Sequence, residues 1–307
     1  MNNTFELTIL GSGSATPTLS RNPAAQLLNI QDQLFLIDCG EGTQIALRKN
    51  KIKFQRINQI FISHMHGDHY LGLAGLLSTF NLLGRSKAVD VFGPEGLEKL
   101  INLHFDLSGT PLNYTIQFHT IDADTKALIY ENKNVLVWAF PLKHRIKTHG
   151  FLIEEKPKLR HINSEATQKF EVPHFKYLEI KKGADFKIES TGEIIPNKEL
   201  TRTATPSYKF AYCSDTAFCP KIIKWIEHAD MLFHETTFMD KDQALANKTY
   251  HSTTLQAAEI AKSAHVNKLI IGHYSARYLN PDMLVDECKT LFSNTFGATD
   301  GKVFSLP

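Results

Sequence analysis

The segment Ser63-His64-Met65-His66-Gly67-Asp68-His69 gives the clearest indication of the fold of this 307-residue chain. It follows a short run of β-branched and aromatic residues, 59–63, which predicts a buried strand. After it, in residues 70–83, apolar side chains recur at helical spacing. The segment is therefore expected at a turn between a strand and a helix, where its side chains converge at the edge of a sheet.

The chemistry of these side chains indicates a metal site. His64 and His66 are two residues apart, on the same side of an extended chain, and can bind one ion together. Asp68 and His69, at the turn into the helix, can face a second ion. Imidazole and carboxylate ligands suit Zn²⁺ better than Mg²⁺, which prefers oxygen ligands alone.

The rest of the chain predicts a mixed α/β protein. Strands that end in small or turn-forming residues are expected in the first half, and strands followed by helices in the second half. This pattern favours an αβ/βα sandwich, in which two mixed sheets pack together with helices outside. The expected strands are residues 5–11, 33–39, 59–63, 89–92, 135–141, 208–213, 231–234 and 268–272. The expected helices are residues 70–83, a helix ending at 103, residues 253–264 with a threonine cap, and a last helix beginning near 281.

Composition is ordinary for a soluble globular protein, with 42% hydrophobic and 21% charged residues. The net charge of +2 means that any binding of nucleic acid has to come from a local patch. The four cysteines form no C-x-x-C pair, which favours reduced thiols and a cytoplasmic location over a disulfide framework. No leader or membrane-spanning stretch is expected.

Residues 154–206 differ from the rest, because they are polar and irregular and contain four prolines. Within residues 156–187, eight Lys/Arg stand against four Asp/Glu, a local charge of +4. We interpret 154–206 as an arm that interrupts a single domain spanning 1–307. A solvated surface loop is the alternative interpretation.

The motif H-x-H-x-D-H after a buried strand resembles the metallo-β-lactamase superfamily. Later residues match the remaining ligand positions of that family one by one: His144, Asp215 and His273 each follow an expected strand. The resemblance implies that one zinc is bound by His64, His66 and His144, the other by Asp68, His69 and His273, and that Asp215 bridges the pair.

Three further features resemble the ribonuclease Z branch of the superfamily. The first is the loop Gly11-Ser12-Gly13-Ser14-Ala15-Thr16-Pro17, which leads to Arg21-Asn22. The second is His234-Glu235-Thr236-Thr237-Phe238, followed by His251-Ser252-Thr253. The third is the arm, which stands where that family carries its tRNA-gripping segment.

This resemblance implies a metal-dependent endonuclease that removes the 3′ trailer from precursor tRNA. Two Zn²⁺ per subunit are expected, with manganese or iron as possible replacements. Asp68 accepts the proton of the attacking water, and His251, oriented by Glu235, assists the leaving 3′ oxygen. The family's arm serves the active site of a second subunit, which implies a homodimer. The residues expected to contact the substrate are Arg21, Asn22, Lys156, Lys158, Arg160, Lys181, Lys182 and Arg277.

Two other functions remain open at this point. A small-molecule hydrolase, such as a lactonase or an arylsulfatase, can use the same fold and metals, but it needs neither the arm nor His251. An RNA-binding scaffold with structural zinc is less favoured, because structural sites are usually closed and lack spare acid or base residues.

Overall fold

The computed structural model describes residues 4–306, which form two compact units. The larger, here called the core unit, contains the described residues up to Glu131, then Val137–Ile153, then those from Lys209 onward. The smaller, here called the arm unit, contains Asn132–Leu136 and Glu154–Tyr208.

The first sheet of the core unit has the strand order β18-β1-β2-β3-β4-β5-β6. Neighbours from β18 to β3 are antiparallel, and those from β3 to β6 are parallel. Its strands are β1 Phe5–Gly11, β2 Ala25–Ile30, β3 Gln33–Ile37, β4 Ile57–Phe61, β5 Val89–Gly93, β6 Ile116–Thr120 and β18 Val303–Leu306.

The second sheet has the order β17-β16-β15-β14-β9-β8-β7. The strands from β14 to β17 are parallel, so their carboxyl ends share one edge of the sheet. Its strands are β7 Ala127–Glu131, β8 Val135–Pro141, β9 His149–Glu155, β14 Lys209–Cys213, β15 Met231–Glu235, β16 Lys268–Gly272 and β17 Thr295–Gly297.

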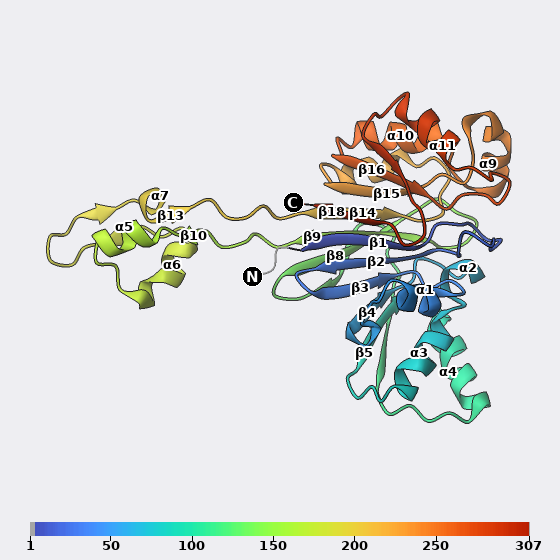
Figure 1. Cartoon of the computed structure of the whole chain (residues 1–307), viewed down its shortest axis with the longest axis horizontal. Coiled ribbons are helices and arrows are strands. Elements are labelled where there is room, and N and C mark those ends of the chain that lie inside the picture. The colour runs from blue at the N-terminus through green and yellow to red at the C-terminus, as the bar shows by residue number, and fades with distance from the viewer. Residues whose placement is uncertain (1–3, 307) are drawn as a thin grey trace. The chain divides into compact units, whose positions relative to one another are not determined.

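The two sheets pack face to face, and helices cover their outer faces (Figure 1). Aromatic side chains fill the space between the sheets: Phe61 of β4 lies 5.6 Å from Phe151 of β9, ring centre to ring centre. The first sheet is covered by α1 Thr43–Lys49, α2 Gly67–Tyr70, α3 Leu73–Leu82 and α4 Leu97–Ser108, with the 3-10 helix η1 Phe54–Arg56. The second is covered by η3 Pro220–Ile222, α8 Ile223–Ile226, η4 Asp240–Asp242, α9 Gln243–Thr249, α10 Thr254–Ser263 and α11 Asp282–Lys289.

This architecture confirms the αβ/βα sandwich expected from the sequence. The expected strands after which His64, Asp215 and His273 follow are present as β4, β14 and β16. Thr253 caps α10 as expected, in a capping box with Gln256. The expected helix at 70–83 is instead two helices, α2 and α3, with Gly72 between them. Gly72 lies so close to the carbonyl of Gly40 that a Cβ there would stand 2.1 Å from its oxygen.

The arm unit contains short regular elements, although its sequence pattern is polar and irregular. It has a small core of Val172, Ile180, Ile195 and Leu200, around which short elements pack. Helices of four to six residues are too short to show a helical period, which is why the sequence pattern misses them. Its elements are β10 His161–Ile162, α5 Ser164–Lys169, η2 His174–Lys176, α6 Tyr177–Lys181, β11 Phe186–Lys187, β12 Ile194–Ile195, α7 Asn197–Leu200 and β13 Thr201–Arg202.

Candidate metal centre

Six histidines and aspartates from strand ends of both sheets meet at one edge of the sandwich, together with His144 from the turn after β8. In the first group, His64 Nε2 lies 3.0 Å from His66 Nδ1, and His144 Nε2 lies 3.1 Å from the same atom. Asp215 Oδ2 lies 3.5 Å from His64 Nε2 and 3.7 Å from His144 Nε2. These four atoms face a common point.

The second group uses the other oxygen of the same aspartate. Asp215 Oδ1 lies 3.4 Å from His69 Nε2 and 3.1 Å from His273 Nε2. Asp68 Oδ2 lies 3.4 Å from both of these imidazole nitrogens. Asp215 therefore belongs to both groups, one carboxylate oxygen in each.

The donor atoms fit divalent metal ions. A tetrahedral ion with bonds of about 2.0–2.1 Å holds its ligand atoms about 3.3–3.5 Å apart, close to the separations in both groups. His69 Nε2 and Asp215 Oδ1 are buried and have no hydrogen-bond partner, which is costly unless both contact a cation. Burial lowers the pKa of His64 to about 4, so its imidazole is neutral and can act as a ligand.

Hydrogen bonds from the chain orient most of these imidazoles. His69 Nδ1 donates to Asp38 Oδ2 at 2.8 Å, and Asp38 also accepts from Tyr212 Oη at 2.6 Å. Ser63 Oγ lies 2.9 Å from both His64 Nδ1 and Asp38 Oδ2, so it accepts from the first and donates to the second. Such partners fix the tautomer and leave Nε2 free for a metal.

Two more imidazoles are held in the same way. His144 Nδ1 donates to the carbonyl of Tyr250 at 2.9 Å, and His273 Nδ1 lies 2.9 Å from Thr237 Oγ1. No role is expected from the sequence for Asp38, Tyr212 or Thr237. Asp38 lies within the expected strand 33–39, so only the structure, in which β3 ends at Ile37, places it just after a strand as Asp215 and His273 are.

Glu235 and His251 form a pair beside the metal groups. His251 Nδ1 lies 2.9 Å from Glu235 Oε1, and Glu235 is fully buried. Burial lowers the pKa of His251, but the Glu235 carboxylate outweighs this effect and raises the pKa to about 9. The effect is reciprocal. Burial raises the pKa of Glu235, but the neighbouring His251 outweighs burial and lowers this pKa below its ordinary value.

Glu235, His251 and His273 are also close enough to form a third metal-binding group. The oxygens of Glu235 are already used, however. Oε1 accepts from the backbone nitrogens of Thr216 at 3.1 Å and Ser252 at 2.9 Å, and Oε2 accepts from Thr237 N at 2.9 Å. Glu235 is therefore better placed to orient His251 than to bind an ion.

The metal groups and His251 share a cavity of about 410 Å³. Its lining includes Asp68, Asp215, His251 and, from the N-terminal loop, Ser14 and Ala15. A cavity of this size can admit part of a substrate strand but not a folded macromolecule.

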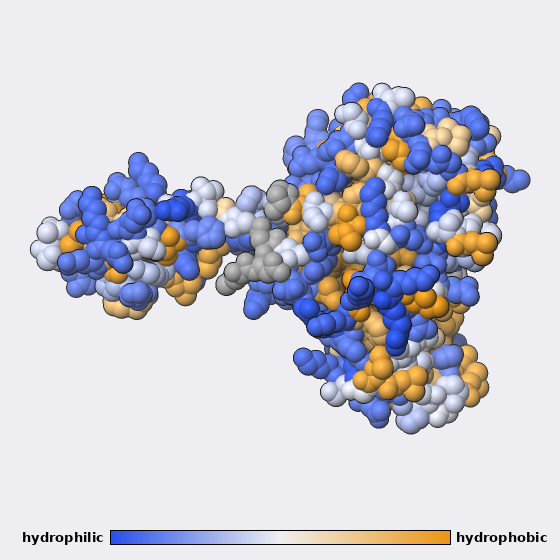
Figure 2. All heavy atoms as spheres, in the orientation of Figure 1, coloured by the Kyte–Doolittle hydropathy of each residue, from blue (hydrophilic) through white to orange (hydrophobic). Residues whose placement is uncertain are grey.

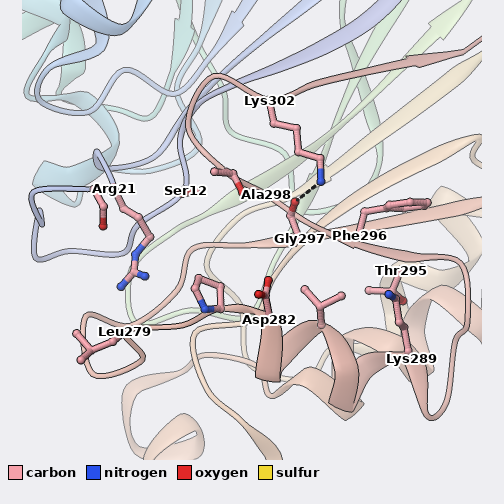
Figure 3. A pocket seen from close by; sticks show the side chains of 14 residues that line it. Ser12, Arg21, Leu279, Asp282, Lys289, Thr295, Phe296, Gly297, Ala298 and Lys302 are labelled. Carbon is pink, nitrogen blue, oxygen red and sulfur yellow. Dashed lines mark hydrogen bonds between the residues drawn. The ribbon is translucent and has the colours of Figure 1, made fainter.

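The residues expected to contact substrate fall into several places. Arg277 lies near the rim of this cavity, with its guanidinium 5.1 Å from the ring of Phe238. Asn22 supports its own loop, because its side-chain amide donates to the carbonyl of Leu10 at 3.1 Å. Arg21 lines a different cavity, together with Lys289 and Lys302 (Figure 3).

The remaining residues in this set belong to the arm unit. There Lys158 is held by Glu155 at 2.9 Å and Arg160 donates to Thr201 Oγ1 at 2.7 Å, whereas Lys182 is exposed.

The sandwich with its His/Asp groups at the strand ends defines a metallo-β-lactamase-fold protein that binds divalent metal. Its structure resembles that of human tRNase Z, short form, with a TM-score of 0.71 and 27% identity, covering 98% of this chain and 99% of that one. The metallo-β-lactamase fold protein YhfI from Bacillus subtilis has the same fold, with a TM-score of 0.70 at 17% identity, covering 99% of this chain and 100% of that one.

Sequence relatives identify the branch. Ribonuclease Z of Porphyromonas gingivalis is 45% identical over 96% of this chain and 97% of its own length. That of Parabacteroides distasonis is 46% identical over 98% of this chain and 99% of its own. The family model that matches residues 5–291 is described as anti-Pycsar protein Apyc1. The chain belongs to the ribonuclease Z family, whose members are endoribonucleases of the metallo-β-lactamase fold.

Proposed function

We propose that this endoribonuclease removes the 3′ trailer from precursor tRNA by hydrolysis at a pair of zinc ions. The observation that carries the proposal is the position of Asp215, which offers Oδ2 to one ligand group and Oδ1 to the other. A carboxylate shared in this way suits two neighbouring ions rather than one. The homologous ribonuclease Z proteins and human tRNase Z support RNA, and tRNA in particular, as the substrate.

His64, His66, His144 and Asp215 would hold one ion, and Asp68, His69, His273 and Asp215 the other. When bound, the pair supplies Lewis acidity for a phosphodiester and a nucleophile from water at neutral pH. Asp68 is placed to take up the proton of the attacking water, since its carboxylate lines the cavity. The donor set of imidazole and carboxylate favours zinc, and manganese or iron are alternatives with related preferences.

His251 is the proposed acid for the leaving 3′ oxygen. Its Nδ1 is bonded to Glu235, so a proton on Nε2 can be given to the substrate. The products are a tRNA with a 3′-hydroxyl and a trailer with a 5′-phosphate.

The arm unit is the proposed binding site for the body of the tRNA. Its basic residues would contact phosphates and so read the shape of the RNA rather than its base sequence. Lys156, Lys181 and Lys182 are the proposed phosphate contacts, with Lys158 and Arg160 nearer to structural roles because of their partners within the unit.

We also propose a homodimer. Leu100, Leu103 and Leu107 recur at i, i+3 and i+7 on α4 and are 37%, 53% and 80% exposed. Apolar residues lie over α3 and α4 on the face drawn in Figure 2. We propose that a second copy of the chain packs against this face. The Leu103→Lys/Leu107→Lys variant tests this, because its mass in solution should then be that of a monomer.

A cytoplasmic location is proposed from the thiols. Cys39, Cys213, Cys219 and Cys288 are all free, as expected in a reducing compartment. Among the described residues, no helix is long and apolar enough to span a membrane.

The experiment that tests the function is cleavage of a precursor tRNA with a 3′ trailer, followed by analysis of the new ends. The expected result is one cut that leaves a 3′-hydroxyl, lost in Asp68→Ala because that variant lacks both a ligand and the proposed base. Hydrolysis of a lactone or an aryl sulfate without cleavage of precursor tRNA would instead support the rival small-molecule hydrolase.

A further inference from the structure

A second, larger cavity lies beside the metal cavity, the 410 Å³ cavity that the metal groups share with His251. Its volume is about 630 Å³. It is lined by residues 94–95 and 120–122, at the ends of β5 and β6, and by Met65, Ile146 and Lys147. We call it the flanking cavity. It contains none of the metal ligands, and the proposed mechanism gives it no role.

The flanking cavity shares a wall with the metal cavity. Met65 lines the flanking cavity, whereas the next residue, His66, lines the metal cavity. In the same way, Arg145 lines the metal cavity and Ile146 lines the flanking one. Two pairs of consecutive residues therefore separate the cavities, so that neighbouring nucleotides of one strand can occupy both.

Hydrogen bonds hold the far wall of the flanking cavity in place. Ile121 N donates to the carbonyl of Gly93 at 2.7 Å and so joins the ends of β6 and β5. His149 Nε2 donates to the carbonyl of Ala123 at 3.1 Å and fixes the same loop from the side of β9. A wall that is already ordered adds little entropic cost when a ligand binds.

The chemistry of the lining favours a nucleobase over a phosphate. Met65 and Ile146 supply apolar surface, and Ile146 is 37% exposed. Two carboxylates, Glu95 and Asp122, stand against one amine, Lys147, among the described lining residues. Lys147 is paired with Asp122, so the remaining charge is negative and repels phosphate. A carboxylate can instead accept a hydrogen bond from an N–H group at the edge of a base.

The position of His251 indicates which part of the substrate lies on this side. In the proposed mechanism His251 protonates the 3′ oxygen, which belongs to the tRNA. His251 lies between α9 and α10, which cover the second sheet, whereas the flanking cavity lies at the ends of β5 and β6 of the first sheet. The trailer, on the other side of the cleaved phosphate, is therefore directed toward the flanking cavity.

We propose that the flanking cavity binds the base of the first trailer nucleotide, the one whose 5′ phosphate is cleaved. This inference rests on the proposed function, because it takes an RNA with a trailer as the substrate. Met65 and Ile146 contact the faces of the base, and Glu95 accepts from an N–H group at its edge. Contact of this kind accepts different bases, because every base has a flat face.

The first test changes the RNA rather than the protein. A 5′-phosphorylated RNA tetranucleotide with a dye at its 3′ end represents the released trailer, and a second tetranucleotide is abasic at its first position. The zinc-loaded wild type is expected to bind the abasic form about tenfold more weakly, as measured by fluorescence anisotropy. Equal affinities would overturn the proposal.

Two tryptophan variants of β6 then locate the base. Thr120→Trp fills the flanking cavity, whereas Gln117→Trp changes an exposed residue of the same strand outside the cavity and is the matched control. Thr120→Trp is expected to reduce the difference between the two tetranucleotides to less than about twofold, and Gln117→Trp to retain it. If Thr120→Trp does not fold, Glu95→Trp fills the cavity from the end of β5. A tenfold difference that persists in a folded cavity-filling variant would overturn the proposal, because the base would then lie elsewhere.

Cleavage of precursor tRNA distinguishes this inference from the proposed function. An abasic first trailer nucleotide is expected to raise KM about tenfold in the wild type and in Gln117→Trp, but not in Thr120→Trp. An unchanged KM in the wild type would overturn the inference and leave the proposed function in place. If the wild type leaves both precursors intact, the proposed function fails, and the tetranucleotide affinities still decide whether the flanking cavity binds a base.

Discussion

At the scale of single residues, Asp38 connects one metal ligand to the buried groups around it. It binds His69, Ser63 and Tyr212 at once, and its own backbone lies in the left-handed region, with φ of 55°. Three residues donate to this one carboxylate, and Asp38 is not among the residues that line the metal cavity. Asp38 is therefore a positioning residue, which acts through the imidazole of His69.

Asp38→Asn is expected to lower zinc affinity by about 10- to 100-fold, because an amide cannot accept from all of these donors. Competition with a chromophoric chelator measures the affinity. Excess zinc should restore most of the turnover, which a general folding defect would not permit. Asp90→Asn, which changes an aspartate of β5 in the same sheet, is the control, and a normal zinc affinity in Asp38→Asn would contradict the assigned role.

His251 can be tested through the leaving group. The 3′ oxygen of RNA is a poor leaving group that needs a proton, whereas p-nitrophenolate needs none. His251→Ala is expected to lower kcat for precursor tRNA by about 10²- to 10⁴-fold and to leave bis-p-nitrophenyl phosphate much less affected. Steady-state kinetics on the two substrates check this, with metal content measured in parallel. Equal losses would mean that His251 holds a metal or shapes the site instead.

At the scale of elements, the sequence predicts the strands that carry the site and misses several others, β2 among them. β4, β14 and β16 are short apolar runs between turn-forming residues, and this pattern is sufficient to predict them as strands. β2 is missed because Gln26, at 1% exposure, and Asn29 interrupt its apolar residues. The partners Asp38 and Tyr212 are 174 residues apart, and no local pattern can indicate that contact.

The capping box of α10 gives an element-scale prediction. Thr253 Oγ1 accepts from Gln256 N at 3.4 Å, and Gln256 Oε1 accepts from Thr253 N at 3.0 Å. Thr253→Ala is expected to lower the free energy of unfolding by about 1 kcal/mol. Urea denaturation of the metal-loaded protein measures it, with Ser263→Ala at the exposed end of the same helix as control. An unchanged free energy would show that the long 3.4 Å bond contributes little.

At the scale of the whole molecule, the metal centre depends on both sheets. His64, His66, Asp68 and His69 follow β4 of the first sheet, while His144, Asp215 and His273 follow strands of the second. Neither half can hold the expected pair of ions alone. Chelation should therefore loosen the packing between the sheets as well as abolish turnover, because the ions link them.

The division into two units gives the last prediction, which distinguishes binding of the tRNA from hydrolysis at the metal centre. The arm unit contains none of the metal ligands, and its chain ends lie together, since Glu155 N donates to the carbonyl of Tyr208 at 2.9 Å. Residues 157–206 can thus be replaced by a short Gly-Ser turn. Removing only 156–187 would leave Ile195 and Leu200 of the arm's small core without partners, so the whole arm should be replaced.

The shortened protein must first be shown to be folded and to keep the oligomeric state of the wild type. It is then expected to lose cleavage of precursor tRNA by at least about 100-fold, while hydrolysis of bis-p-nitrophenyl phosphate stays within about twofold, because phosphate contacts in the arm contribute affinity only to the tRNA. A milder variant, Lys181→Ala/Lys182→Ala, should weaken tRNA binding and flatten its salt dependence without altering the fold. Loss of both activities would place the arm in the catalytic site. Full cleavage of precursor tRNA by the shortened protein would leave the arm as a solvated appendage with no part in recognition.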